Sequence, residues 1–357
     1  MKKRIVLLLM GASLALSPIA SFAGPKIHES FNRLLSEARS GNPRSELLLG
    51  YYYMNNLKDN QQAIYWLKQA AKKNYPPAFD MLSTIYSTRY SDIPLNYKKT
   101  YYYAKKGADL GQATSENNLG MLYYGGSYVK KDYIKAKELF EKSAAKGNAV
   151  GTFNLGQVYF YGNSVSKDKR NGINLYRKAA LKGYAFAEGE LAAVYQVGDG
   201  IPINFPFSYM WYKIAEINGS QKAKRNFFND HMAEFKKQLP YCIAQGQANV
   251  GVMYSKGLAG LPKDGEKAME WLQRANETDP NLAGIQLNLS KFYYAGIGTE
   301  QDPARAFHYA KKAASQPFGP AQQYLAQFYF NGVATKRDLV LAYAWLLDRK
   351  STRLNSS

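Results

Sequence analysis

Two adjoining stretches decide the fold of this chain. Ala113 to Asn148 reads ATSENNLGMLYYGGSYVKKDYIKAKELFEKSAAKGN, and Ala149 to Tyr184 reads AVGTFNLGQVYFYGNSVSKDKRNGINLYRKAALKGY. Each stretch carries a leucine, a small residue beside it and a tyrosine four positions after the leucine. The same frame recurs along the chain, and we call its first position the lead residue: Leu49, Leu82, Leu119, Leu155, Leu191, Val250, Leu289 and Leu325. Self-similarity of this kind indicates a repeat architecture.

A second set of positions follows each lead residue in the same frame. A small residue such as Ala136 comes about 17 positions after the lead residue, and a bulky residue such as Leu139 follows three positions later. Spacings of three, four and seven residues bring side chains together on a helix but not on a strand. Each unit therefore predicts two amphipathic helices, and neighbouring units must stack because one helix pair cannot bury both of its faces.

The segments between the two expected helices contain turn residues. Glycines such as Gly126 and Gly162 permit the positive φ that ends a helix. Four aspartates follow at equivalent places and are expected to cap the second helix of their units: Asp132, Asp168, Asp264 and Asp302.

These residues together resemble the Sel1-like repeat, a relative of the tetratricopeptide repeat. The resemblance covers about Pro43 to Leu347. It implies an all-α fold, a right-handed α/α solenoid of about eight helix-pair repeats with the last one truncated, that binds other proteins. Bacterial members with signal peptides look like periplasmic or secreted adaptors. One branch of the family is rich in paired cysteines and is linked to β-lactam chemistry, but this chain has one cysteine, Cys242.

The first 23 residues have the pattern of a secretory signal peptide. Three cations precede an apolar run from Ile5 to Leu16, and small residues lie at Ser21 and Ala23. We expect cleavage after Ala23 and a periplasmic or secreted protein; an uncleaved N-terminal anchor is the alternative. Residues 24–42 are a lead-in to the repeats.

The repeats are expected in two blocks, residues 43–220 with repeats 1–5 and residues 241–347 with repeats 6–8. Residues 221–240 between them predict an inserted amphipathic helix that Pro240 ends. In residues 348–357, Arg349 and Lys350 fall where other repeats have a small pair, and charges cannot be buried there unpaired. The segment also resembles a read-through tail found on unrelated chains. We expect it to be non-native and not to complete the last helix.

The first helices should line the concave face of the solenoid. Positions two before, two after and five after the lead residue are expected on its exposed side, as a partner-binding surface: Asn117, Met121, Tyr124, Phe153, Gln157, Phe160, Lys291, Tyr294, Gln323, Gln327 and Phe330. Aromatic and amide side chains suit an extended peptide or a protein helix. The alternative is that the aromatic residues merely pack between neighbouring units.

The chain carries 47 Lys and Arg against 27 Asp and Glu, a formal charge of +20. The excess favours either an acidic partner, such as lipid headgroups, an acidic envelope polymer or an acidic protein, or an evenly solvated lysine surface, since many lysines lie near expected helix ends. We expect a protein or peptide partner, a monomer, no nucleic acid and no transmembrane segment in the mature chain.

Catalytic and metal-binding patterns are absent from the sequence. It has no Gly-x-Ser-x-Gly, no His-Glu-x-x-His and only three histidines, His28, His231 and His308. We therefore expect no catalytic residue, no metal and no cofactor, and a scaffold rather than an enzyme. A cell-wall or β-lactam-acting enzyme is the alternative that the cysteine-rich relatives suggest.

Overall fold

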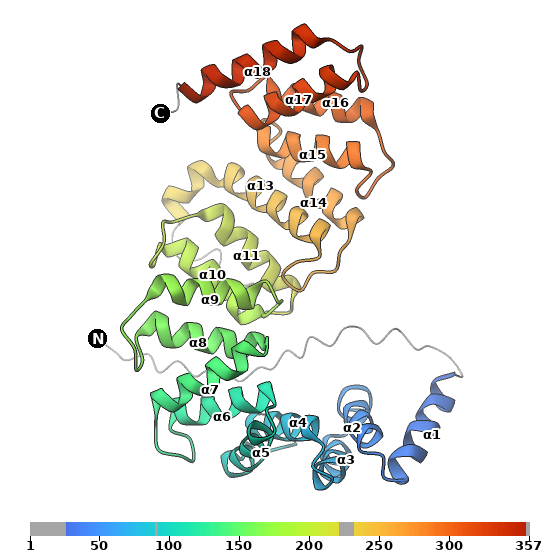
Figure 1. The fold of residues 1–357 in the computed structure, drawn as a ribbon, viewed down its shortest axis with the longest axis vertical. Helices are drawn as coiled ribbons and strands as arrows, with labels where there is room; N and C mark the ends of the chain where they lie inside the picture. The colour runs from blue at the N-terminus through green and yellow to red at the C-terminus, as the bar shows by residue number, and fades with distance from the viewer. Residues whose placement is uncertain (1–25, 90–91, 221–231, 355–357) are drawn as a thin grey trace. The chain divides into compact units, whose positions relative to one another are not determined.

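The structure is a computed structural model that describes residues 26–89, 92–220 and 232–354. Within these ranges the chain forms 17 α-helices and no strand, so the all-α prediction is confirmed. The helices fall into two compact units, residues 1–179 and residues 180–357 (Figure 1). The expected signal peptide and residues 221–231 of the expected insertion lie outside the described ranges.

In the first unit, a leading helix is followed by four helix pairs. We call the two helices of a pair helix A and helix B. The bounds are α1 Lys26–Arg39, then α2 Pro43–Tyr52 with α3 Asn60–Lys72, α4 Pro76–Ser87 with α5 Tyr97–Asp109, α6 Ala113–Gly125 with α7 Tyr133–Ala145, and α8 Ala149–Tyr161 with α9 Lys169–Ala180. A π-helical turn, Tyr53–Leu57, continues α2.

The second unit also holds four pairs. They are α10 Ala185–Val197 with α11 Phe205–Ile217, α13 Met232–Lys256 with α14 Gly265–Thr278, α15 Ala283–Ala295 with α16 Pro303–Ala314, and α17 Gly319–Asn331 with α18 Leu339–Leu354. Within each unit the helices pack on their neighbours in chain order, so each unit is an α/α solenoid.

One backbone hydrogen bond closes the turn of every pair. The N–H of the residue that caps helix B donates to the carbonyl of the tyrosine four positions after the lead residue, at 2.8 to 3.0 Å. The eight donor–acceptor pairs are Asp59–Tyr53, Asn96–Tyr86, Asp132–Tyr123, Asp168–Tyr159, Asn204–Tyr195, Asp264–Tyr254, Asp302–Tyr293 and Asp338–Tyr329. The four predicted aspartate caps are confirmed, as in Asp132, whose carboxylate accepts from the N–H of Lys135 at 3.0 Å.

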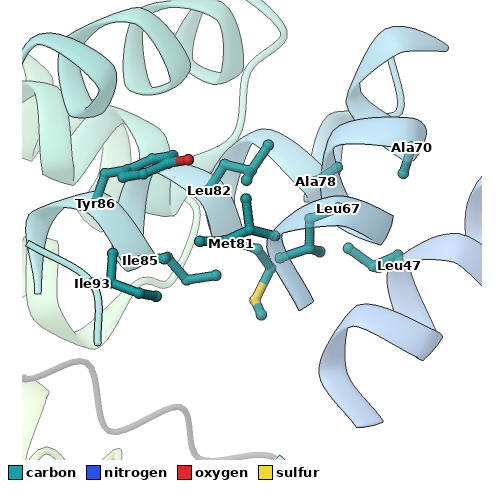
Figure 2. Close-up of a cluster of buried hydrophobic side chains, with 10 residues drawn as sticks. Leu47, Leu67, Ala70, Ala78, Met81, Leu82, Ile85, Tyr86 and Ile93 are labelled. Atoms are coloured by element: carbon teal, nitrogen blue, oxygen red, sulfur yellow. The ribbon is translucent and has the colours of Figure 1, made fainter. Parts of the chain in front are cut away.

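Small residues let the two helices of a pair approach closely. A Cβ added to Gly156 would lie 2.8 Å from the ring of Tyr176 and 3.0 Å from the carbonyl oxygen of Gly172. Larger side chains fill the space beside such contacts. Figure 2 shows this in the first two pairs, where Leu67, Leu82 and Ile85 are almost fully buried.

A polar contact also ties helix A to the end of helix B in several pairs. Three positions before the lead residue, a buried glutamate meets a side chain at the C-cap of helix B. Glu46 binds Lys73 at 2.5 Å, and Glu116 binds Lys146. In the fifth pair the partner is an amide, because Asn218 donates to Glu188 at 2.8 Å.

The prediction that Pro240 ends an inserted helix is wrong. Helix α13 runs without a break from Met232 to Lys256 and contains Pro240. Proline removes one backbone donor, but this position is exposed and the rest of α13 is held by packing against α11 and α14. The end of the insertion and the A helix of the sixth pair are therefore one element.

The prediction for the last helix is also wrong. Helix α18 continues through Asp348 to Leu354. Arginine and lysine are good helix formers. Their charges oppose burial of Arg349 and Lys350, but they do not prevent these residues from being helical. The side chains of residues 348–354 lie outside the described ones.

Candidate partner-binding surface

Five of the predicted partner-binding residues are buried, so the expectation that they line a free surface is wrong. All five lie on α6 and α8: Asn117, Met121, Phe153, Gln157 and Phe160. The alternative interpretation, that these side chains pack between helices, holds for this part of the chain. Phe153 and Phe160, for example, both lie against the ring of Tyr176 on α9, with centroids 5.1 and 5.6 Å apart.

The burial has a clear cause in the first unit, because its A helices pack against one another. The amide of Asn154 on α8 donates to Asn117 on α6 at 2.7 Å. The amide of Asn118 donates to the hydroxyls of Ser83 and Thr84 on α4, at 2.9 and 3.1 Å. These amides bridge α4, α6 and α8 through side chains beside the lead residues, and Asn117, Asn118 and Asn154 are buried as a result.

Tyr124 is half-buried, and its side chain makes contacts within the protein. Its hydroxyl accepts a hydrogen bond from Asn163 at 2.6 Å, and its ring meets Tyr133 edge to face. Burial raises the pKa of Tyr124 to about 12. This side chain therefore holds the turn after α8 against α6.

The other five predicted residues are exposed and lie together on two helices of the second unit. Lys291 and Tyr294 belong to α15, and Gln323, Gln327 and Phe330 belong to α17. We call these five residues the α15–α17 surface. The structure thus brings together the predicted residues of the last two pairs only.

Cations and rings organise the α15–α17 surface. The ammonium of Lys291 lies 5.7 Å from the ring centre of Tyr324, which joins α15 to α17. Tyr294 meets Phe328 edge to face at 5.7 Å, and the guanidinium of Arg337 lies 5.6 Å from the ring centre of Phe330. Stacked cations and edge-to-face rings of this kind hold aromatic side chains in fixed positions.

Lys291 is the one charged residue of the α15–α17 surface, and Arg337 lies beside its Phe330. Asp302 and Asp338 accept backbone hydrogen bonds as the caps of α16 and α18. Sequence reasoning missed Tyr324 and Arg337. Arg337 directly precedes the capping residue Asp338, and this position would have placed Arg337 in the turn after α17.

No catalytic or metal centre is found within the described ranges. They contain no group of three or more His, Cys, Asp or Glu side chains that could hold a metal ion. Cys242 is buried and reduced, and burial raises the pKa of its thiol. Burial also raises the pKa of Glu188 to about 8, but its hydrogen-bond donor is the Asn218 amide, so the pair is a structural contact.

Of the helices that the structure describes, none is both long enough and apolar enough to cross a bilayer.

Similarity to known proteins extends over the whole chain in solved structures and over a short stretch in one curated protein. A protective antigen of uropathogenic Escherichia coli with an SLR fold is 23% identical, with 91% of this chain and 90% of that chain covered and a TM-score of 0.45. A Sel1 repeat protein from Oxalobacter formigenes is 22% identical, with 96% and 95% covered and a TM-score of 0.35. The HRD3B component of an ERAD-associated E3 ubiquitin-protein ligase of Arabidopsis thaliana is 31% identical over 108 residues, which are 29% of this chain and 17% of that protein.

The family comparison covers most of the chain. The Sel1 repeat model matches eight segments, residues 43–75, 81–112, 113–148, 149–184, 185–220, 244–277, 286–318 and 319–347. Each segment contains one lead residue and spans one helix pair of the structure or most of it. The chain therefore belongs to the Sel1 repeat family.

Proposed function

We propose that this chain is an exported scaffold that holds a partner protein on its α15–α17 surface. The Sel1 repeat is a fold that mediates protein–protein interaction. The observation that carries the proposal is the contrast between the two units. The positions two after and five after the lead residue are exposed on both α15 and α17, where Phe330 keeps 54% of its surface accessible. On α6 and α8 the same two positions are buried, apart from the half-buried Tyr124.

The chemistry of this surface fits a peptide or helix that carries acidic side chains. Tyr294 and Phe330 provide exposed aromatic area near the C-terminal ends of α15 and α17, and the amides of Gln323 and Gln327 on α17 provide donors and acceptors. Aromatic anchors surrounded by polar groups dominate the energy of protein interfaces. Lys291 and Arg337 favour an acidic partner.

The proposed compartment is the periplasm or the exterior of the cell. Its support is the sequence of the first 23 residues, with cations, an apolar run and a small residue at Ala23. Mass spectrometry of the N-terminus of protein recovered from cell fractions tests this part. Cleavage after Ala23 in the exported fraction is expected, and an intact Met1 on membrane-bound protein would favour the anchor.

The partner surface can be tested by photo-crosslinking in the producing cell. A photoreactive amino acid at Tyr294 or at Phe330 should give a common adduct, which mass spectrometry then identifies. The same group at Tyr65, an exposed tyrosine of α3, is the matched control. Identical adducts from all three positions, or none from Tyr294 and Phe330, would contradict the proposed surface.

Alanine variants separate binding from folding. Tyr294→Ala and Phe330→Ala should each lower partner recovery by about tenfold or more while the melting temperature stays close to that of the parent. Purified protein should not hydrolyse a chromogenic β-lactam or peptidoglycan. Turnover above that of a denatured sample would contradict the scaffold function.

A further inference from the structure

Three consecutive turns of the first unit bring exposed tyrosines and lysines to one edge. They are the turns that lead into α5, α7 and α9. We call six exposed residues in these turns and at the helix ends beside them the cationic edge: Tyr97, Lys98, Tyr128, Lys130, Tyr161 and Lys167. Tyr128, Lys130 and Lys167 lie in the turns, Tyr97 and Lys98 begin α5, and Tyr161 ends α8.

Contacts between neighbouring turns show that the edge is continuous. The ring of Tyr128 lies 5.5 Å from the ring of Tyr101 on α5. This contact joins the second turn of the edge to the helix that follows the first turn. The hydroxyl of Ser164 in the third turn donates to the carbonyl of Tyr133 at the start of α7, at 3.2 Å. The three turns therefore lie side by side.

Helix stability does not explain the lysines of the edge. Lys98, Lys130 and Lys167 lie beside the N-termini of α5, α7 and α9, where the helix dipole is already positive. Among the described residues no carboxylate forms an ion pair with any of the three. The nearby Asp132 and Asp168 are occupied as helix caps.

Tyr128 is the bulkiest residue found at its position in the described turns. Its φ of 68° lies in the left-handed region, where bulky residues are strained. Six other pairs also have a positive φ at the equivalent residue, which is glycine in two of them and Lys58, Ser164, Ala259 or Ala334 in the other four. Among the described turns only the third pair places a ring there, and Tyr128 is 56% exposed.

We propose that the cationic edge docks on the surface of an anionic lipid bilayer. A flat, negatively charged surface can reach three protruding turns at once, and lysines near such a surface are attracted to its headgroups. Tyrosine suits the interface because its ring enters the headgroup layer while its hydroxyl stays hydrated. This edge lies in the first unit, and the proposal does not depend on the partner bound by the α15–α17 surface.

Vesicle binding by the full chain tests the proposal. Sedimentation with phosphatidylcholine vesicles should recover little protein, and vesicles with about one third phosphatidylglycerol should recover most of it, less so as salt is raised. The triple variant Lys98→Gln, Lys130→Gln and Lys167→Gln should lower the partition coefficient about a hundredfold, since each lysine near the surface contributes about fivefold.

A variant with the same change of charge is the control. Lys72, Lys106 and Lys142 lie in the last turns of α3, α5 and α7 and are exposed. Their replacement by glutamine should lower binding by less than about threefold. An equal loss in both triple variants would mean that net charge alone drives binding, and the proposal would be wrong.

Tyr128→Gly separates binding from stability. It should raise the melting temperature because the strain is removed, and it should weaken binding to anionic vesicles severalfold. Unchanged vesicle binding would mean that Tyr128 does not contribute to docking by the cationic edge. If polyglutamate bound to the edge and vesicles did not, the edge would recognise an acidic chain and the bilayer proposal would be overturned.

Discussion

Glu188 on α10 gives a prediction about how stability depends on pH. Its side chain is fully buried, and Asn218 donates to one carboxylate oxygen at 2.8 Å. The second oxygen has no hydrogen-bond partner among the described residues. Asn218 also donates to the carbonyl of Ala259 at 2.8 Å, so this amide joins the fifth pair to the sixth.

The magnitude follows from the pKa of Glu188, which burial raises from 4.5 to about 8. The folded chain keeps this proton between these two values, whereas the unfolded chain loses it. Stability should therefore be full below about pH 4.5 and fall by about 1.4 kcal/mol per pH unit as the pH rises towards 8, a total of about 5 kcal/mol. Glu188→Gln should remove this dependence, because glutamine stays neutral and its carbonyl can still accept from Asn218.

Hydrogen exchange of peptides from α10 and α11 measures the local opening directly. In the parent chain, the opening free energy of these helices should fall between about pH 5 and about pH 8, after correction for the intrinsic exchange rate. In Glu188→Gln it should stay level. At about pH 8 the variant should be the more stable by about 2–4 kcal/mol, since its unpaired amide hydrogens offset part of the gain.

Glu116→Gln is the matched control, at the equivalent position of α6. Its carboxylate is paired with Lys146 rather than with an amide, so the variant should be less stable than the parent by about 1–3 kcal/mol at neutral pH. The same pH profile in the parent and in Glu188→Gln would refute the reasoning, because Glu188 would then be ionised in the folded chain.

Further substitutions probe the helix contacts, each by urea denaturation. Gly156→Ala should cost about 1–3 kcal/mol because its Cβ would lie 2.8 Å from the ring of Tyr176, whereas Gly189→Ala, with no atom within 4 Å, should stabilise α10 by about 0.5–1 kcal/mol. Asp132→Ala removes the cap of α7 and should cost about 1 kcal/mol. Asn118→Leu removes the buried amide that binds two hydroxyls of α4, and should cost about 1–3 kcal/mol.

The helix pairs and their turns could be predicted from the sequence because their signals are local. The tyrosine after each lead residue and the aspartate or asparagine before helix B lie within about ten residues of each other, and the bond between them recurs in every pair. The glycines at positive φ belong to the same short segments. Local signals misled at Pro240, which α13 accommodates, and at Arg349 and Lys350, which α18 includes.

The candidate surface could be predicted only in part. Phe160 and Phe330 occupy the same position after the lead residue, yet Phe160 is buried and Phe330 is exposed. The difference depends on neighbours from other helices, such as Tyr176 of α9 against Phe160. In the first unit, polar side chains such as Asn154 and Asn117 draw the A helices together and close the surface.

The sequence by itself determined that this chain is a series of helix pairs, because periodicity, glycine turns and aspartate caps act within a few residues. Only the tertiary structure decided which faces of those helices remain accessible and which charges are paired. Lys146 meets Glu116 across one pair, while Asn218 leaves Glu188 half satisfied in another. Accessibility and pairing are set by distances between helices, and no single repeat contains that information.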